Sequence, residues 1–169
     1  GLNQSSYALR FDPENPDIIF APNHFGRGML RSIDGGVTWT SSQAGLPIVG
    51  NDAQLLWDLA IKPTDHNIVI AATNSGLFIS TDNGISFSQA PATGLTGNSQ
   101  FTAVAYRSDG VLFAGKSDGA FGYSTDNGTS FTQALGPSGV SVDSIVISTY
   151  WIYLGFKNGS IYRLDATSL

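Results

Sequence analysis

The sequence contains no cysteine, which excludes disulfide bonds and thiolate metal sites. Charged residues are only 12% of the chain, and eight Lys and Arg face thirteen Asp and Glu, giving a net charge of −5. Because no basic stripe is available to neutralise phosphates, we exclude nucleic acid as a partner. No apolar run approaches the roughly 18 residues of a membrane-spanning helix, so we predict no membrane span.

What the sequence does contain is typical of an all-β protein. Hydrophobic residues make up 41% of the 169 positions, enough for a buried core, and 20 glycines accompany many Ser, Thr and Asn residues. Such a composition favours strands joined by tight turns. Low charge together with abundant small polar residues also favours an extracellular or cell-surface location.

An internal repeat of 40 to 50 residues is the strongest signal, because such a period is typical of propellers and solenoids. The pattern Ser-x-Asp-x-Gly-x-(Thr/Ser)-aromatic occurs three times, starting at Ser32, Ser80 and Ser124. We predict that each Asp accepts backbone N–H groups two residues on and that each Gly adopts a positive φ in a hairpin turn. The aromatic residue is predicted to be buried against a neighbouring sheet. The residues assigned to this structural motif are Ser32, Asp34, Gly36, Trp39, Ser80, Asp82, Gly84, Phe87, Ser124, Asp126, Gly128 and Phe131.

Three apolar strands precede or enter each motif, and a fourth follows it, so every repeat predicts one four-stranded antiparallel blade. We therefore predict a partial β-propeller of about four blades within one domain, residues 1–169. A fourth repeat begins near Val142 but has no motif and no outer strand. Either residues 1–5 supply that strand, or the chain is a slice of a longer propeller, which we favour because an uncovered sheet edge is normally paired. The predicted blades span 5–44, 53–91, 100–135 and, incompletely, 141–169.

These motifs resemble the Asp-box, or bacterial neuraminidase repeat, of a β-propeller superfamily that includes sialidases, xyloglucanases, sortilin and a photosystem II assembly factor. The second repeat, with its strands at 57–61 and 68–72 and its motif at 80–87, is most similar to xyloglucanase-type blades. Sortilin-like propellers are the other similar group. The resemblance implies the fold and leaves the function open, because this superfamily hosts unrelated activities.

The resemblance also tests two enzymatic interpretations. Sialidases use an arginine triad and a Tyr–Glu pair, whereas this chain has only Glu14 and no Arg-Ile-Pro signature, so we exclude that activity. Xyloglucanases use two aspartates across a cleft between two whole propellers, which one incomplete propeller does not form. Asp58 and Asp143 are the weak catalytic candidates, because both stand at equivalent places near the start of an innermost strand, two blades apart.

Ligands of propellers usually bind at the face opposite the motif turns, where the loops between second and third strands lie. An aromatic ring beside Asn, Asp and Arg suits a sugar, which stacks on the ring and bonds through its hydroxyls. The histidines His24 and His66 lack ligand spacing, and we predict neither a metal nor a cofactor. The predicted binding residues are His24, Phe25, Arg27, Trp57, Lys116, Asp118, Phe156 and Asn158.

Three functional hypotheses follow. The first is a non-catalytic propeller segment that serves as a binding scaffold for a glycan or a protein, with further blades supplied by a parent chain or by a second copy. The second is part of a xyloglucanase-like glycoside hydrolase whose cleft is completed elsewhere. The third is an assembly factor that holds another protein on its propeller face.

Overall fold

A computed structural model describes residues 9–22, 29–49, 52–53, 56–134 and 139–169. Within these ranges the chain forms four main antiparallel sheets, each a simple meander in chain order. Their strands are β1 (Arg10–Phe11), β2 (Ile19–Pro22), β3 (Met29–Ser32) and β4 (Thr40–Ser41) in sheet 1; β7 (Leu56–Ile61), β8 (Val69–Thr73), β9 (Gly76–Ser80) and β10 (Ser88–Gln89) in sheet 2; β11 (Phe101–Tyr106), β12 (Leu112–Lys116), β13 (Phe121–Ser124) and β14 (Thr132–Ala134) in sheet 3; and β15 (Val142–Ile147), β16 (Trp151–Phe156) and β17 (Ile161–Asp165) in sheet 4.

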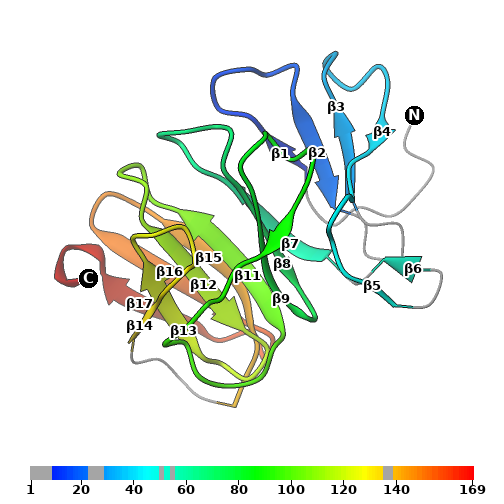
Figure 1. The fold of residues 1–169 in the computed structure, drawn as a ribbon. Coiled ribbons are helices and arrows are strands. Elements are labelled where there is room, and N and C mark those ends of the chain that lie inside the picture. Colours follow the sequence, from blue (N-terminus) through cyan, green and yellow to red (C-terminus); the bar gives the residue numbers. More distant parts are fainter. Residues whose placement is uncertain (1–8, 23–28, 50–51, 54–55, 135–138) are drawn as a thin grey trace.

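The sheets follow one another in chain order from sheet 1, at the upper right of Figure 1, to sheet 4, at the lower left. This arrangement of successive antiparallel meanders, four-stranded in sheets 1 to 3 and three-stranded in sheet 4, is a β-propeller, as the repeat predicts. The strands predicted at 57–61 and 68–72 correspond to β7 and β8, each displaced by one residue at the ends that differ. One element was not anticipated: a small hairpin of β5 (Ile48–Val49) and β6 (Asp52–Ala53) lies in the connection between sheets 1 and 2.

The hydrophobic core is divided into three layers, one between each pair of consecutive sheets. Phe20 and Met29 of sheet 1 pack against Leu59 and Val69 of sheet 2. The opposite face of sheet 2 packs on sheet 3, and sheet 3 packs in turn on sheet 4. Both faces of the middle sheets are thus buried, which explains why β8 and β12 are apolar without alternation up to their last residues, Thr73 and Lys116.

The three Ser-x-Asp turns have one geometry. In the second, the Ser80 hydroxyl donates to Asp82 at 2.7 Å and accepts the Gly84 N–H at 2.8 Å. Asp82 also accepts the backbone N–H of Ser86 at 2.9 Å and its hydroxyl at 2.5 Å. The main backbone donor therefore lies four residues beyond the Asp, where the sequence interpretation placed it two residues on. The three glycines Gly36, Gly84 and Gly128 have positive φ, as predicted.

A second repeated contact connects the outer strands of sheets 1 and 2 to the sheet that follows each of them. After β4, Ala44 forms a parallel bridge with Ser86, and its carbonyl accepts the Phe87 N–H at 2.8 Å. After β10, Thr93 makes the same contact with the start of the outer strand of sheet 3. Gly45 follows with φ +79°, and a Cβ there would lie 1.8 Å from the Phe87 carbonyl oxygen. Only glycine fits this close backbone approach.

Sheet 4 ends differently from the others. By strand register, Leu164 occupies the place of the first serine of a Ser-x-Asp turn, because it pairs with Ile152 as Ser124 pairs with Leu112. Instead of turning into an outer strand, residues 166–168 form a short 3-10 turn capped by Asp165, which accepts the Thr167 N–H at 2.8 Å. Among the described residues, sheet 4 has three strands, in agreement with the predicted incomplete last blade.

Candidate binding site at the channel mouth

A β-bulge occurs at one position in the innermost strands of sheets 2, 3 and 4. The register shifts between Leu56 and Asp58 in β7, and the corresponding shifts in β11 and β15 fall at the same place. The extra residues are Trp57, Thr102 and Asp143. Bulges re-aim side chains and are common next to functional sites. Each of these bulges places one residue per sheet outside the register of the strand pairing, so its side chain does not follow the alternation that the pairing imposes.

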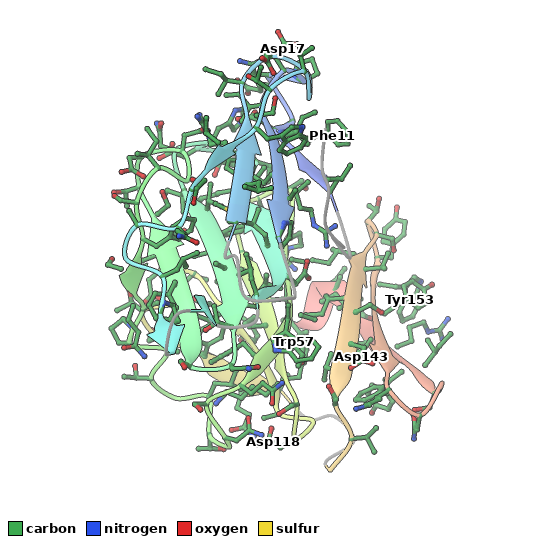
Figure 2. The ribbon with its side chains drawn as sticks, turned by 90° about the vertical axis from the view of Figure 1, so that its right-hand side faces the viewer. Phe11, Asp17, Trp57, Asp118, Asp143 and Tyr153 are labelled. Atoms are coloured by element: carbon green, nitrogen blue, oxygen red, sulfur yellow. The ribbon has the colours of Figure 1, made fainter. Side chains whose placement is uncertain are left out.

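These three side chains line one cavity of about 1020 Å³. Figure 2 shows Trp57 and Asp143 facing the space between sheet 2 and sheet 4. The other wall residues come from strands β1, β7 and β15 and from the loops before and after the strands of sheets 3 and 4. They are Arg10, Asp58, Gln100, Ser117, Gly139, Val140, Ser141, Ser144, Ile145, Val146, Lys157 and Asn158.

Trp57 is the aromatic component of this cavity. Its side chain is half-buried, and its indole N–H donates to the Asn74 side chain at 2.5 Å. Asn74 lies in the turn between β8 and β9, so this hydrogen bond fixes the indole ring against its own sheet. The result is a rigid aromatic surface at the cavity wall, which a flexible side chain would not provide.

Asp58 lines the same cavity but is fully engaged. Its carboxylate is paired with Arg10 of sheet 1 and accepts the Leu59 N–H at 2.8 Å and the Val104 N–H of sheet 3 at 3.1 Å. Burial raises the pKa of Asp58, and the charge of Arg10 opposes that shift. This carboxylate therefore joins three sheets and holds their innermost strands together.

The register also corrects the equivalence that the sequence suggested for the two aspartates. Because Asp143 is the bulge residue, its counterpart in sheet 2 is Trp57, and the counterpart of Asp58 is Ser144. Asp143 is exposed, and its carboxylate accepts a hydrogen bond from the Ser141 hydroxyl at 2.7 Å. The structure brings both aspartates to one cavity, but in unlike environments.

Lys116 and Phe156 occupy the last positions of β12 and β16, where the sequence interpretation placed them in loops. Both are buried. The Lys116 ammonium donates to the Leu95 carbonyl at 2.9 Å and lies 4.8 Å from the centre of the Phe101 ring, and burial lowers its pKa. Phe156 belongs to the core between sheets 3 and 4. Neither side chain is part of the cavity wall.

Asp118 and Asn158 both lie in turns at this end of the molecule. Asp118 accepts the Asn98 N–H at 2.6 Å and stabilises its own turn by accepting the Ala120 N–H, so its oxygens are engaged. Asn158 is exposed, lines the cavity and accepts the Ser160 N–H at 3.0 Å. The predicted binding residues His24, Phe25 and Arg27 lie outside the described residues.

Sequence reasoning missed several polar groups of the wall. Gln100 and Ser141 directly precede the innermost strands of sheets 3 and 4, and their carbonyls accept the N–H groups of Ser117 and Lys157 at 3.1 and 3.0 Å. Aligning the repeats could have identified them, because Gln100 and Ser117 in the third repeat stand at the same positions as Ser141 and Lys157 in the fourth. Reading the bulge, however, requires the pairing of strands, which a single sequence does not display.

Two further classes of site are not seen in the part of the chain that the structure describes. No three His, Asp or Glu side chains gather there as metal ligands would. No described helix has the length and apolar character needed to cross a membrane.

Comparison with known proteins relates the chain to xyloglucanase propellers. No protein-family model matches it. A xyloglucanase of Hypocrea jecorina (strain QM6a) is 32% identical over 108 residues, which are 64% of this chain and 12% of that protein. The crystal structure of the GH74 xyloglucanase from Xanthomonas campestris superposes with a TM-score of 0.75 at 19% identity, over 96% of this chain and 29% of that one. The computationally designed Ika4 protein superposes with a TM-score of 0.64 at 14% identity, over 98% and 93%.

The solved structures support the propeller fold, and the Hypocrea jecorina enzyme adds a sequence similarity to a xyloglucanase over 108 residues. The chain spans only about an eighth of the curated xyloglucanase and less than a third of the natural solved enzyme. At such low identity the structural likeness shows the fold alone, and the function has to be argued from the cavity.

Proposed function

We propose that this chain is a non-catalytic β-propeller segment of the Asp-box type that binds a glycan at the channel mouth. The observation that carries the proposal is the cavity that joins the fixed indole of Trp57 to the exposed polar groups of Asp143 and Asn158. The propeller supplies a rigid frame, and the three bulges supply the variable side chains.

The chemistry of this wall suits a sugar. A pyranose ring presents C–H groups on one face, which stack on an aromatic surface, and hydroxyls at its edge, which donate to and accept from amides and carboxylates. The bulge residues Trp57, Thr102 and Asp143 provide an aromatic ring, a hydroxyl and a carboxylate. A β-linked glucan chain such as xyloglucan is our first ligand, because the curated relative is a xyloglucanase. A polysaccharide ligand implies an extracellular or cell-surface setting.

The cavity does not support hydrolysis by this chain alone. Glycosidases of the inverting type need one carboxylic acid and one carboxylate that activates water, both free to act. Asp58 has both oxygens occupied by Arg10 and two backbone N–H groups. Asp143 is then the one exposed carboxylate among the described residues of the wall.

The second candidate is a portion of a xyloglucanase-like hydrolase whose catalytic cleft is completed by other blades. The sequence similarity to the Hypocrea jecorina enzyme favours it over the assembly-factor hypothesis. In that case Asp143 would contribute to one wall of a longer substrate groove.

Calorimetric titration with xyloglucan oligosaccharides tests the proposal. We expect binding that weakens roughly tenfold in Trp57→Ala, because the stacking surface is lost. Tyr150→Ala is the matched control, since Tyr150 is an exposed aromatic residue that is not part of the cavity wall, and it should bind like the wild type. Equal affinity in all three proteins would refute the site. Release of reducing sugar by the isolated chain, abolished by Asp143→Asn, would instead establish the hydrolase.

A further inference from the structure

The outer face of sheet 4 is the face that points away from sheet 3. The corresponding faces of sheets 2 and 3 are buried, because the next sheet in the chain packs on each of them. By strand register, Ile161 of β17 corresponds to Leu77 in sheet 2 and to Phe121 in sheet 3. Those two side chains are 0% and 1% exposed because the following sheet covers them, whereas Ile161 is 76% exposed. Val146, paired with Tyr153 across the same face, is 59% exposed.

Figure 2 shows Tyr153 pointing away from the other sheets, into the space that a following sheet would fill. Its counterparts in sheets 2 and 3 are Ile70 and Phe113, both fully buried in the layers between sheets. The outer face of sheet 4 therefore has the residue types of an interface that is made twice before in this chain.

The opposite end of the chain carries the other half of that interface. In sheet 3 the face toward the preceding sheet includes Val104 and Tyr106, which pack on sheet 2. The corresponding residues of sheet 1 are Leu9 and Phe11, which are 45% and 56% exposed. Each copy thus exposes apolar side chains on the outer face of sheet 4 and on the face of sheet 1 that points away from sheet 2.

Charge follows the same repeat. Arg31 of sheet 1 donates to Asn83 at 2.6 Å and is attracted first by Asp12 and then by Asp82, and both Asn83 and Asp82 belong to the Ser-x-Asp turn of the following sheet. Arg163 stands at the position of Arg31 in sheet 4, since it pairs with Tyr153 as Arg31 pairs with Phe20. The turn of sheet 1 supplies Asp34 at the position of Asp82.

We infer that two copies of this chain associate head to tail, with the outer face of sheet 4 of each copy packed on sheet 1 of the other. Arg163 of one copy then faces Asp34 of the second. When both contacts form at once, the two-fold dimer closes eight sheets around one channel, within the usual range for propellers. Val146 also lines the cavity, so the second copy would complete the wall of the proposed glycan site.

Light scattering coupled to gel filtration tests this directly. We expect the wild type to have twice the mass of the 17.8 kDa chain, with dissociation on dilution. Ile161→Glu and Phe11→Glu should each weaken dimerisation roughly tenfold or more, because each places a charge in an apolar contact. Ile85→Glu is the matched control, since Ile85 is equally an exposed isoleucine but lies on a Ser-x-Asp turn, and it should remain dimeric.

Mixing distinguishes the head-to-tail contact from others. An Ile161→Glu copy and a Phe11→Glu copy together retain one intact contact, so the mixture should dimerise more tightly than either variant alone. A wild type that is monomeric at every concentration, or larger than two copies, contradicts the inference. So does loss of the dimer in Ile161→Glu but not in Phe11→Glu, which would indicate two sheet 4 faces packed on each other. Circular dichroism checks that each variant is folded, and oligosaccharide titration of a monomeric chain tests the glycan site separately.

Discussion

The two ends of the sheets use the same residue type for opposite purposes. At the turn end, Asp34 and Asp82 are enclosed by hydrogen bonds from their own turns, and the hydroxyls of Thr38 and Ser86 are the main reason that the pKa values of these carboxyls fall to about 2. At the channel mouth, Asp143 accepts one hydroxyl and otherwise faces an open cavity. A motif that repeats along the chain marks the scaffold, whereas the site lies where the repeats differ.

We expect the largest effect on stability when two glycines are compared, one at a contact between sheets and one at the rim of the cavity. Gly45→Ala forces a Cβ to within 1.8 Å of the Phe87 carbonyl oxygen at a tie between sheets, and we expect it to destabilise the protein by more than about 3 kcal/mol. Gly139→Ala, at the cavity rim, has a similar positive φ but meets no atom within 4 Å, and should cost about 1 kcal/mol. Urea unfolding measures both, and equal losses would contradict the close-approach explanation.

The second comparison concerns the two aspartates of the cavity. Asp58→Ala leaves the buried Val104 N–H without its acceptor and the partly exposed Arg10 without its ion-pair partner, and should cost about 1–3 kcal/mol. Asp143→Ala removes an exposed side chain and should change stability by no more than about 0.5 kcal/mol. Thermal unfolding of the two variants decides the matter. If Asp58→Ala were as stable as Asp143→Ala, Asp58 would not be the joint between sheets.

The contribution of the carboxylates in the Ser-x-Asp turns to stability should depend on pH in the acid range. Their pKa is lower in the folded than in the unfolded state, so the stability they contribute is complete above about pH 4 and is lost as the pH falls toward 2. Asp82→Asn should therefore be less stable than the wild type by roughly 1 kcal/mol at pH 7, with the difference vanishing near pH 2. For Asp58 the sign is reversed, because burial raises its pKa and its proton stabilises the folded state. The stability of the wild type relative to Asp58→Asn should therefore increase as the pH falls. Unfolding at several pH values checks both slopes.

The smallest expected effect is confined to binding. Asp143→Asn keeps the shape and one acceptor of the side chain but removes its charge, so we expect affinity for a xyloglucan oligosaccharide to fall by roughly threefold, with stability unchanged. Calorimetry on the folded variant measures this. A loss as large as that of Trp57→Ala would indicate that charge, rather than the aromatic surface, dominates recognition.

The sequence was sufficient for the parts of the fold that repeat. Three turns at spacings of 48 and 44 residues predicted three sheets, and the missing fourth motif predicted the three-stranded sheet 4, in which Leu164 stands at the place of the expected serine. These features are local, because each turn is stabilised by hydrogen bonds between residues no more than four positions apart.

The site was only partly predictable, because it depends on pairing between strands. Trp57, Asp143 and Asn158 were expected at the mouth and lie in one cavity. Lys116 and Phe156 were expected beside them but end buried strands, and the bulge shifted Asp143 by one residue relative to Asp58. Polarity suggested that Lys116 was exposed, whereas two carbonyls and the Phe101 ring compensate its burial.

The most direct test of the central claim is to map a bound xyloglucan oligosaccharide by NMR chemical-shift changes on the folded chain. If the channel mouth is the site, the largest changes will cluster on Trp57, Gln100, Asp143 and Asn158, with the Asn74 side chain affected through its hydrogen bond to the indole. If the largest changes instead cluster on the Ser-x-Asp turns at Asp34, Asp82 and Asp126, the claim is contradicted.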